Sequence, residues 1–117
     1  MKNFRINHRT ESGLEVLDLH GELDAHTASQ LEDSLKKLID SQKSSIIVNC
    51  SKLEYIASAG LGVFMAYIED VRENGGDIKL TNMTDKVYNV FDLLGFPTLY
   101  DILPDEKEAI EKFSSEA

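Results

Sequence analysis

Residues 44–64, SSIIVNCSKLEYIASAGLGVF, decide the fold of this chain. The short run 44–50 is centred on β-branched residues, which is typical of a strand buried in the middle of a parallel sheet. A loop over 51–57 is expected next. From Leu61 onward, apolar residues at Phe64, Met65, Ile68 and Val71 follow the spacing of a helix. The stretch therefore predicts a strand followed by a helix, the unit from which α/β sheets are built.

Upstream of this stretch, the sequence predicts a hairpin and a helix. Residues 4–10 and 14–21 flank a short turn, and both runs favour strands. Thr27, followed three residues later by Gln30, matches a capping box that would start a helix over 27–40. Its predicted apolar face consists of Leu31, Leu35, Leu38 and Ile39.

Downstream, the helix from the opening stretch should end at Asn74 and Gly75, which supply a left-handed cap. A strand over 77–82 and a helix over 84–95 should follow. That helix would bury Val87, Val90, Phe91 and Leu94 and stop at Gly95.

The C-terminal part should add a short edge strand over 100–103 and a last helix from Pro104, with a fraying tail at about 114–117. The whole chain, 1–117, is then expected to form a single small α/β domain. Its mixed sheet would have about four or five strands, with about four helices packed on it.

Composition limits the classes of partner. The chain has 117 residues, 42% of them hydrophobic, which suits one compact domain. Its net charge of -9 should repel phosphate backbones and anionic membranes, so neither nucleic acid nor a membrane is expected as a partner. The acidity either keeps a small protein in solution or steers it toward a basic protein partner.

Cysteine usage and the first residues favour the cytoplasm. Cys50 is the only cysteine, so it cannot form a disulfide within the chain, and a reducing compartment is expected. Residues 1–20 lack the pattern of a secretion signal, and no apolar run approaches the length of a membrane span.

Motifs for catalysis are missing from the sequence. It contains no P-loop, no complete dinucleotide fingerprint, and no glycine two residues before Ser58 that a nucleophile elbow requires. His8, His20 and His26 have no second ligand at metal-site spacing. We therefore expect a protein that is not an enzyme, with no catalytic residue, bound metal or cofactor.

Ser58 is the most informative polar residue. A serine directly before a helix is typical of an N-cap. Gly60 and Gly62 are costly in a first helical turn, and their small size would let another molecule approach the serine closely. For Gly62, tight packing of the helix on the sheet is an equal alternative. A helix N-terminus also favours a phosphate, so a phosphoserine here would be compatible with the fold.

Two further residues belong to the predicted site. The loop that contains Asp24 should leave the sheet at the same edge as the Ser58 loop, which would make the two residues neighbours. Leu61 has the spacing of a core position, but if exposed it would be an apolar anchor for a partner. Both interpretations of Leu61 stay open at the level of sequence.

Three segments together resemble the STAS domain: GELDAHTA (21–28), IIVNCSKLEYIASAGLG (46–62) and NGGDIKLTN (74–82). The similarity extends over nearly the whole chain and is greatest to the free-standing anti-sigma factor antagonists of bacterial partner-switching systems. It implies a small mixed sheet with helices packed on it, in agreement with the predicted order of elements.

The resemblance also implies a function and partners. Antagonists of this family bind an anti-sigma factor that is a serine kinase with a histidine-kinase-like ATPase fold, and thereby free a sigma factor. Phosphorylation of the family's serine, which matches Ser58, ends the binding, and a metal-dependent serine phosphatase restores it. The partner-binding residues implied here are Asp24, Ser58, Gly60 and Leu61, in a cytoplasmic protein expected to be a monomer.

One position departs from the family pattern. Many relatives carry aspartate immediately before the serine, where this chain has Ala57. The departure favours an alternative function, a STAS scaffold in another signalling or lipid-transport complex that is not phosphorylated. An enzyme or small-ligand carrier that uses the Ser58 loop is a third alternative.

Overall fold

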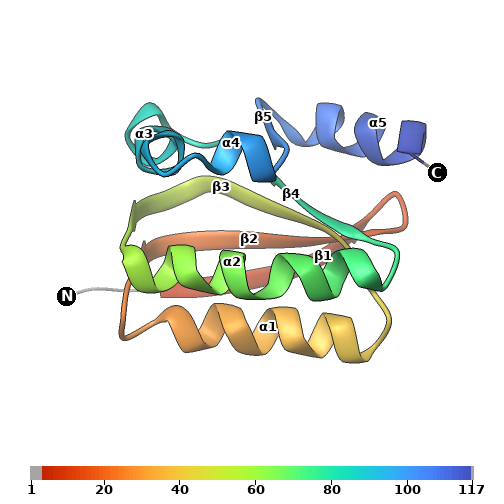
Figure 1. Cartoon of the computed structure of the whole chain (residues 1–117), viewed down its shortest axis with the longest axis horizontal. Coiled ribbons are helices and arrows are strands. Elements are labelled where there is room, and N and C mark those ends of the chain that lie inside the picture. Colours follow the sequence, from red (N-terminus) through yellow and green to blue (C-terminus); the bar gives the residue numbers. More distant parts are fainter. Residues whose placement is uncertain (1–3, 117) are drawn as a thin grey trace.

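A five-stranded sheet with the order β1-β2-β3-β4-β5 organises the protein (Figure 1). The computed structural model describes residues 4–116. The strands are β1 (Phe4–Glu11), β2 (Leu14–Leu23), β3 (Ser45–Ile56), β4 (Asp77–Thr81) and β5 (Ile102–Leu103). β1 is antiparallel to β2, and the other neighbours are parallel. The predicted hairpin, mixed sheet and α/β class are thus confirmed.

Helices cover both faces of the sheet. They are α1 (Ala28–Asp40), α2 (Ser58–Glu73), α3 (Asp85–Leu93), α4 (Phe96–Leu99) and α5 (Glu106–Glu116). In Figure 1, α1 and α2 run side by side along the sheet, α3 and α4 form one corner, and α5 lies apart from α1 and α2. Within β2, Leu17 belongs to the cluster under α1 and α2, whereas Val16 belongs to a cluster with α5. Because successive strand residues point to opposite faces, α5 packs on the face opposite α1 and α2.

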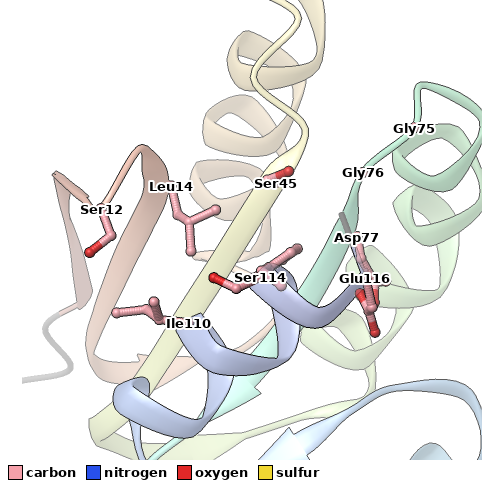
Figure 2. Close-up of a pocket in the computed structure, with 10 residues that line it drawn as sticks. Ser12, Leu14, Ser45, Gly75, Gly76, Asp77, Ile110, Ser114 and Glu116 are labelled. Atoms are coloured by element: carbon pink, nitrogen blue, oxygen red, sulfur yellow. The ribbon is translucent and has the colours of Figure 1, made fainter.

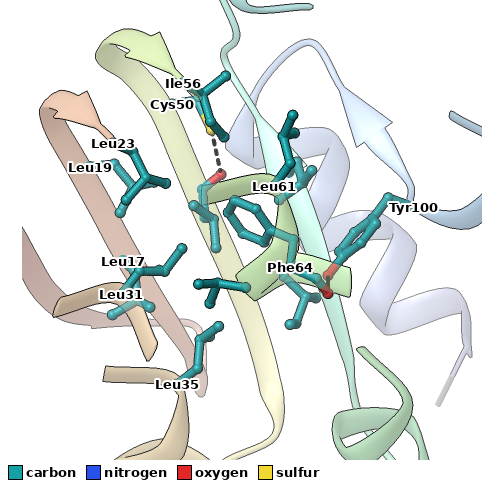
Figure 3. Packing of buried hydrophobic residues seen from close by; sticks show 14 of the residues in the cluster. Leu17, Leu19, Leu23, Leu31, Leu35, Cys50, Ile56, Leu61, Phe64 and Tyr100 are labelled. Carbon is teal, nitrogen blue, oxygen red and sulfur yellow. Dashed lines mark hydrogen bonds between the residues drawn. The ribbon is translucent and has the colours of Figure 1, made fainter. Parts of the chain in front are cut away.

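The main core lies between the sheet and α1, α2, α3 and α4. Figure 3 shows Leu17 and Leu19 of β2 opposite Leu31 and Leu35 of α1. At the other end of the core, the Phe64 ring lies 6.0 Å, centroid to centroid, from the rings of Phe91 and Tyr100. The Tyr100 hydroxyl donates a 2.7 Å hydrogen bond to the Phe64 carbonyl, so this buried phenol is not left unpaired.

The structure corrects the predicted loop over 51–57, because β3 continues to Ile56. Two register shifts in the pairing of β2 with β3 explain why the sequence does not indicate a strand. Around these shifts the buried residues of β3 are Cys50, Leu53 and Ile56, so burial recurs at every third position instead of every second. Gly21, at one shift, has a left-handed φ of 95°, which glycine adopts at little cost.

Helix ends agree with the sequence in part. Gly75 has the predicted left-handed φ, 83°, after α2, and Gly95 has one of 77° after α3. Leu94 follows the end of α3 and is 62% exposed, so its predicted core position is wrong. α4 was not predicted, because four residues are too few to produce a helical period.

The C-terminal elements begin later than expected. The edge strand is reduced to β5, since Tyr100 is buried in the main core. Ser114 to Glu116 belong to α5, so the predicted fraying is wrong there, and Ala117 lies outside the described residues.

Candidate functional site

The ends of β2 and β3 bring the two predicted site segments together. Leu23 and Ile56 are partners in the parallel ladder, and the Ala57 N–H donates a 2.9 Å hydrogen bond to the Leu23 carbonyl. The next residues along the chain are Asp24 and Ser58, so the loop that precedes α1 and the start of α2 leave the sheet side by side. The expectation that both segments emerge at the same edge is confirmed.

Ser58 is exposed and is the first residue of α2. The expected N-cap role is wrong, because Ala57 occupies the cap position in an extended conformation, with no side-chain cap. The Ala57 carbonyl instead accepts the N–H groups of Gly60 and Leu61, at 3.0 and 3.2 Å. The exposed Ser58 side chain therefore lies in the first turn of α2, at the positive end of the helix dipole.

The two glycines of the first turn have opposite surroundings. A Cβ built on Gly60 would lie 2.7 Å from Leu23 Cγ and 3.1 Å from Ile56 Cγ1, so this glycine lets α2 approach the ends of β2 and β3. A Cβ on Gly62 would meet nothing within 4 Å. The close packing considered for Gly62 therefore occurs at Gly60, and the open surface occurs at Gly62.

Leu61 lies in the core. It is 5% exposed and belongs to the main cluster, as Figure 3 shows beside Phe64 and Ile56. The core interpretation of Leu61 is confirmed, and an exposed anchor at this position is ruled out. Its contribution to any partner site is to hold α2 in place.

Asp24 is also buried, at 6% exposed, and it organises its own loop. Its Oδ1 accepts the N–H of His26 at 2.9 Å and that of Thr27 at 3.3 Å, and its carbonyl accepts the Ala28 N–H at 2.9 Å. These bonds satisfy N–H groups at the start of α1. Asp24 therefore fixes the loop that adjoins the start of α2.

The capping box at Thr27 is wrong for a related reason. The Thr27 hydroxyl donates to the Glu22 carbonyl at 2.9 Å and accepts the Asp24 N–H at 2.9 Å, and it does not cap α1. The Thr27 side chain thus stabilises the loop before α1 instead of the first turn of the helix.

One of the apolar residues at helical spacing in α2 is exposed to solvent instead of facing the sheet. Met65 is 53% exposed. Seven residues after Ser58, it lies on the same side of α2, because seven residues make almost two full turns. Ala59, Gly62 and Ala66 are exposed as well. We call the exposed side of α2 formed by Ser58, Ala59, Gly62, Met65 and Ala66 the Ser58 surface. A helical-period argument alone could not find Met65, since it lies beside the buried Phe64 in the same apolar run.

The ionisable groups of residues 4–116 do not form a metal site, since no cluster of His, Cys, Asp and Glu suited to an ion occurs there. The His8 ring contacts the Glu15 carboxylate at 2.7 Å. Burial raises the pKa of the Cys50 thiol to about 12, which makes it a poor nucleophile.

No helix in the described part of the chain is long and apolar enough to cross a membrane.

Comparison with known proteins establishes the family. The STAS domain family model matches residues 5–109, so the chain belongs to the STAS domain family. It is 30% identical over 94 residues to the anti-sigma-B factor antagonist of Bacillus subtilis (strain 168), an alignment that covers 80% of this chain and 84% of the relative.

Solved structures show the same fold. An anti-sigma factor antagonist from Mycobacterium paratuberculosis superimposes with a TM-score of 0.86 at 19% identity, over 94% of this chain and 93% of that one. The Bacillus cell fate determinant SpoIIAA in its phosphorylated form gives a TM-score of 0.71 at 24% identity, over 95% and 99% of the two chains. The fold expected from the STAS resemblance is therefore confirmed.

Proposed function

We propose that this protein is an anti-sigma factor antagonist that binds an anti-sigma factor serine kinase through the Ser58 surface. The observation that carries the proposal is the exposed hydroxyl at the start of α2, beside the open position of Gly62. The relative at 30% identity, named an anti-sigma-B factor antagonist, supports the same function for this chain.

The site favours a switch by phosphorylation. A phosphate on Ser58 would add nearly two negative charges at the dipole-positive end of α2, where a helix tolerates them. The same charges would disrupt a partner packed against the small and apolar residues Ala59, Gly62 and Met65, because the phosphate would lose its hydration there. The unphosphorylated protein is thus the binding form, and a metal-dependent serine phosphatase restores it.

The proposal assigns the chain no catalytic step. It acts as a binding module in the cytoplasm, where its partner kinase supplies the chemistry and the ATP. Asp24, Gly60 and Leu61 act indirectly, because their side chains or close packing position the start of α2 and the loop next to it.

Intact-mass analysis after incubation with the kinase and ATP tests the switch. We expect one added phosphate, located on Ser58 by fragmentation, and none on Ser58→Ala. Ser29→Ala is the matched control, since Ser29 is also exposed in the first turn of a helix, α1. Loss of the phosphate from Ser29→Ala, or its retention by Ser58→Ala, would contradict the assignment.

Binding is tested separately with Ser58→Asp. We expect it to keep the fold, by circular dichroism, and to lose the kinase in a pull-down, while Ser58→Ala binds constitutively. Equal retention of the kinase by both variants would refute a switch at this serine.

A second function is favoured by Ala57, the position at which many relatives carry aspartate. With alanine there, α2 has no side-chain cap and no acidic residue in its first turn. An always-on antagonist or scaffold follows if the kinase binds tightly in the pull-down but adds no phosphate.

A further inference from the structure

α5 covers the sheet face opposite α1 and α2 with few fully buried apolar residues, although its Ile110 and Phe113 also pack there while partly exposed. The cluster beneath it contains three fully buried residues, Val16, Ile47 and Ala109, whereas 22 buried residues form the main cluster. Ala109 is the only buried residue that α5 supplies. Apolar burial therefore contributes far less to the docking of α5 than to the packing of α1 and α2.

Charged groups hold both ends of α5. At its first turn, Glu106 accepts hydrogen bonds from Arg9 of β1 and Asn49 of β3. Arg9 is oriented for this contact by Asp18, to which it donates from Nε at 2.8 Å and from an η nitrogen at 3.0 Å. Planar two-point contact of this kind fixes a guanidinium in one direction.

At the other end of α5, the ammonium group of Lys79 on β4 is fully buried. It donates to Asp101 at 2.8 Å, to Asp77 at 3.0 Å and to Glu116 of α5 at 3.2 Å. The Phe113 ring of α5 lies 4.6 Å from the same nitrogen. Two of the three carboxylates thus belong to the sheet side, and only one belongs to the helix.

The sheet would keep satisfied charges if α5 left. Arg9 would retain Asp18, and Lys79 would retain Asp77 and Asp101, while water replaced the helix. Removal of one partner from a buried ion pair is costly because it leaves the other charge buried and unpaired. Detachment of α5 would leave no buried charge unpaired. Detachment would also hydrate the Thr81 hydroxyl, which is buried and has no hydrogen-bond partner within residues 4–116.

The contact is incompletely filled. A half-open cavity of about 420 Å³ lies under the C-terminal half of α5, between Ile110 and Phe113 and the starts of β2, β3 and β4 (Figure 2). α5 follows β5 after Pro104 and Asp105, both exposed, and the backbone bonds that hold β5 to β4 do not involve α5. A hinge before Asp105, which accepts a 2.9 Å hydrogen bond from the Glu108 N–H and would move with α5, would release the helix without disturbing the sheet.

From these observations we infer that α5 is a salt-sensitive latch. It detaches from the sheet as a unit while the sheet and α1 to α4 stay folded, and it then uncovers a face on which Arg9, Asn49 and Lys79 surround the apolar residues Val16 and Ile47. This inference does not depend on the proposed function, because α5 lies on the face opposite the α2 helix that carries Ser58.

Hydrogen exchange of the full chain, read by mass spectrometry at about 0.05 M and about 0.5 M NaCl, tests the latch. At high salt we expect α5 peptides to exchange about tenfold faster and α2 peptides less than twofold faster, because salt screens the partly exposed Arg9–Glu106 pair that holds the first turn of α5. Equal acceleration in both helices, or none in α5, would overturn the proposal.

A pair of variants separates docking from helix stability. Glu106→Gln should accelerate α5 exchange about tenfold at low salt and leave α2 unchanged, because it removes the charge that Arg9 and Asn49 bind. Glu108→Gln removes the same charge from the same turn, at an exposed position, and should change α5 exchange less than twofold. Equal effects of the two substitutions would show that helix propensity, and not the latch, controls the exchange.

Discussion

The face of the sheet under α1 and α2 carries a continuous apolar cluster, whereas the face under α5 combines three buried apolar residues with two groups of charged side chains. Apolar burial stabilises by about 25 cal/mol per Å² and is insensitive to ionic strength. Ion pairs give a smaller net gain, because desolvation opposes their attraction, and partly exposed pairs weaken with salt. One sheet therefore combines a face that sets global stability with a face that can open locally.

Substitution of one aromatic residue on each face tests this difference most strongly. Phe64→Ala should lower the free energy of unfolding by about 3–5 kcal/mol, because the ring is fully buried among Phe91 and Tyr100. Phe113→Ala should lower it by about 1–2 kcal/mol, because the ring is half-buried and loses only part of its packing and its contact with Lys79. Urea denaturation measures both values, and equal losses would contradict the contrast between the faces.

Alanine substitutions of the two glycines at the start of α2 should change the free energy of unfolding by smaller amounts and in opposite directions. Gly60→Ala should cost about 1–3 kcal/mol, because the new methyl group would overlap Leu23. Gly62→Ala should add about 0.5–1 kcal/mol, since the methyl group enters open space and alanine favours the helix. Thermal unfolding of the two variants measures both; a destabilised Gly62→Ala would show that this position is less open than the structure indicates.

The paired carboxylates under α5 and the buried thiol of the main core should lose their stabilising effects at opposite ends of the pH scale. Under α5, the hydrogen bonds from Arg9 hold the pKa of Asp18 below its ordinary value of 3.8 against the effect of burial. At Asp101, burial raises the pKa, but the Lys79 ammonium outweighs it and leaves that pKa lowered as well. A carboxylate with a lowered pKa stabilises the fold above about pH 4 and loses that effect as the pH falls.

In the main core, the pKa of Cys50 is raised by burial from 9.0 to about 12, and burial also raises the pKa of Tyr100. Their neutral forms stabilise the fold fully below pH 9, and the effect of Cys50 is lost between pH 9 and 12. Unfolding free energies across the pH range should show both losses. Asp18→Asn should weaken the pH dependence of the unfolding free energy at acid pH, and Cys50→Ala should weaken it at alkaline pH. The opposite result for the two variants would refute this account.

The sequence predicted the architecture because most elements carry strong local signals. The α1 face at Leu31, Leu35 and Leu38, and the glycine that ends α2, were confirmed. The end of β3 was missed because its register shifts break the alternation of buried residues, and no local pattern reports pairing with a distant strand.

At the candidate site, residue types were informative but their roles were not. The sequence could not separate Gly60 from Gly62 or Leu61 from Met65, because each pair differs only in which side of α2 meets the strand ends. Thr27 does not cap α1, because its hydroxyl bonds to Glu22 and Asp24 within the loop. Contacts made outside the helical repeat decided each of these cases.

The burial of Cys50 makes the protein convenient for spectroscopy. It is the only cysteine, it lies entirely inside the main core, and its thiol should resist maleimide reagents while that core is closed. A cysteine introduced at an exposed position could therefore take a single fluorophore without removal of the native residue. In the unlabelled protein, the reaction rate of Cys50 would measure how often the main core opens. Release of α5 alone should not change that rate.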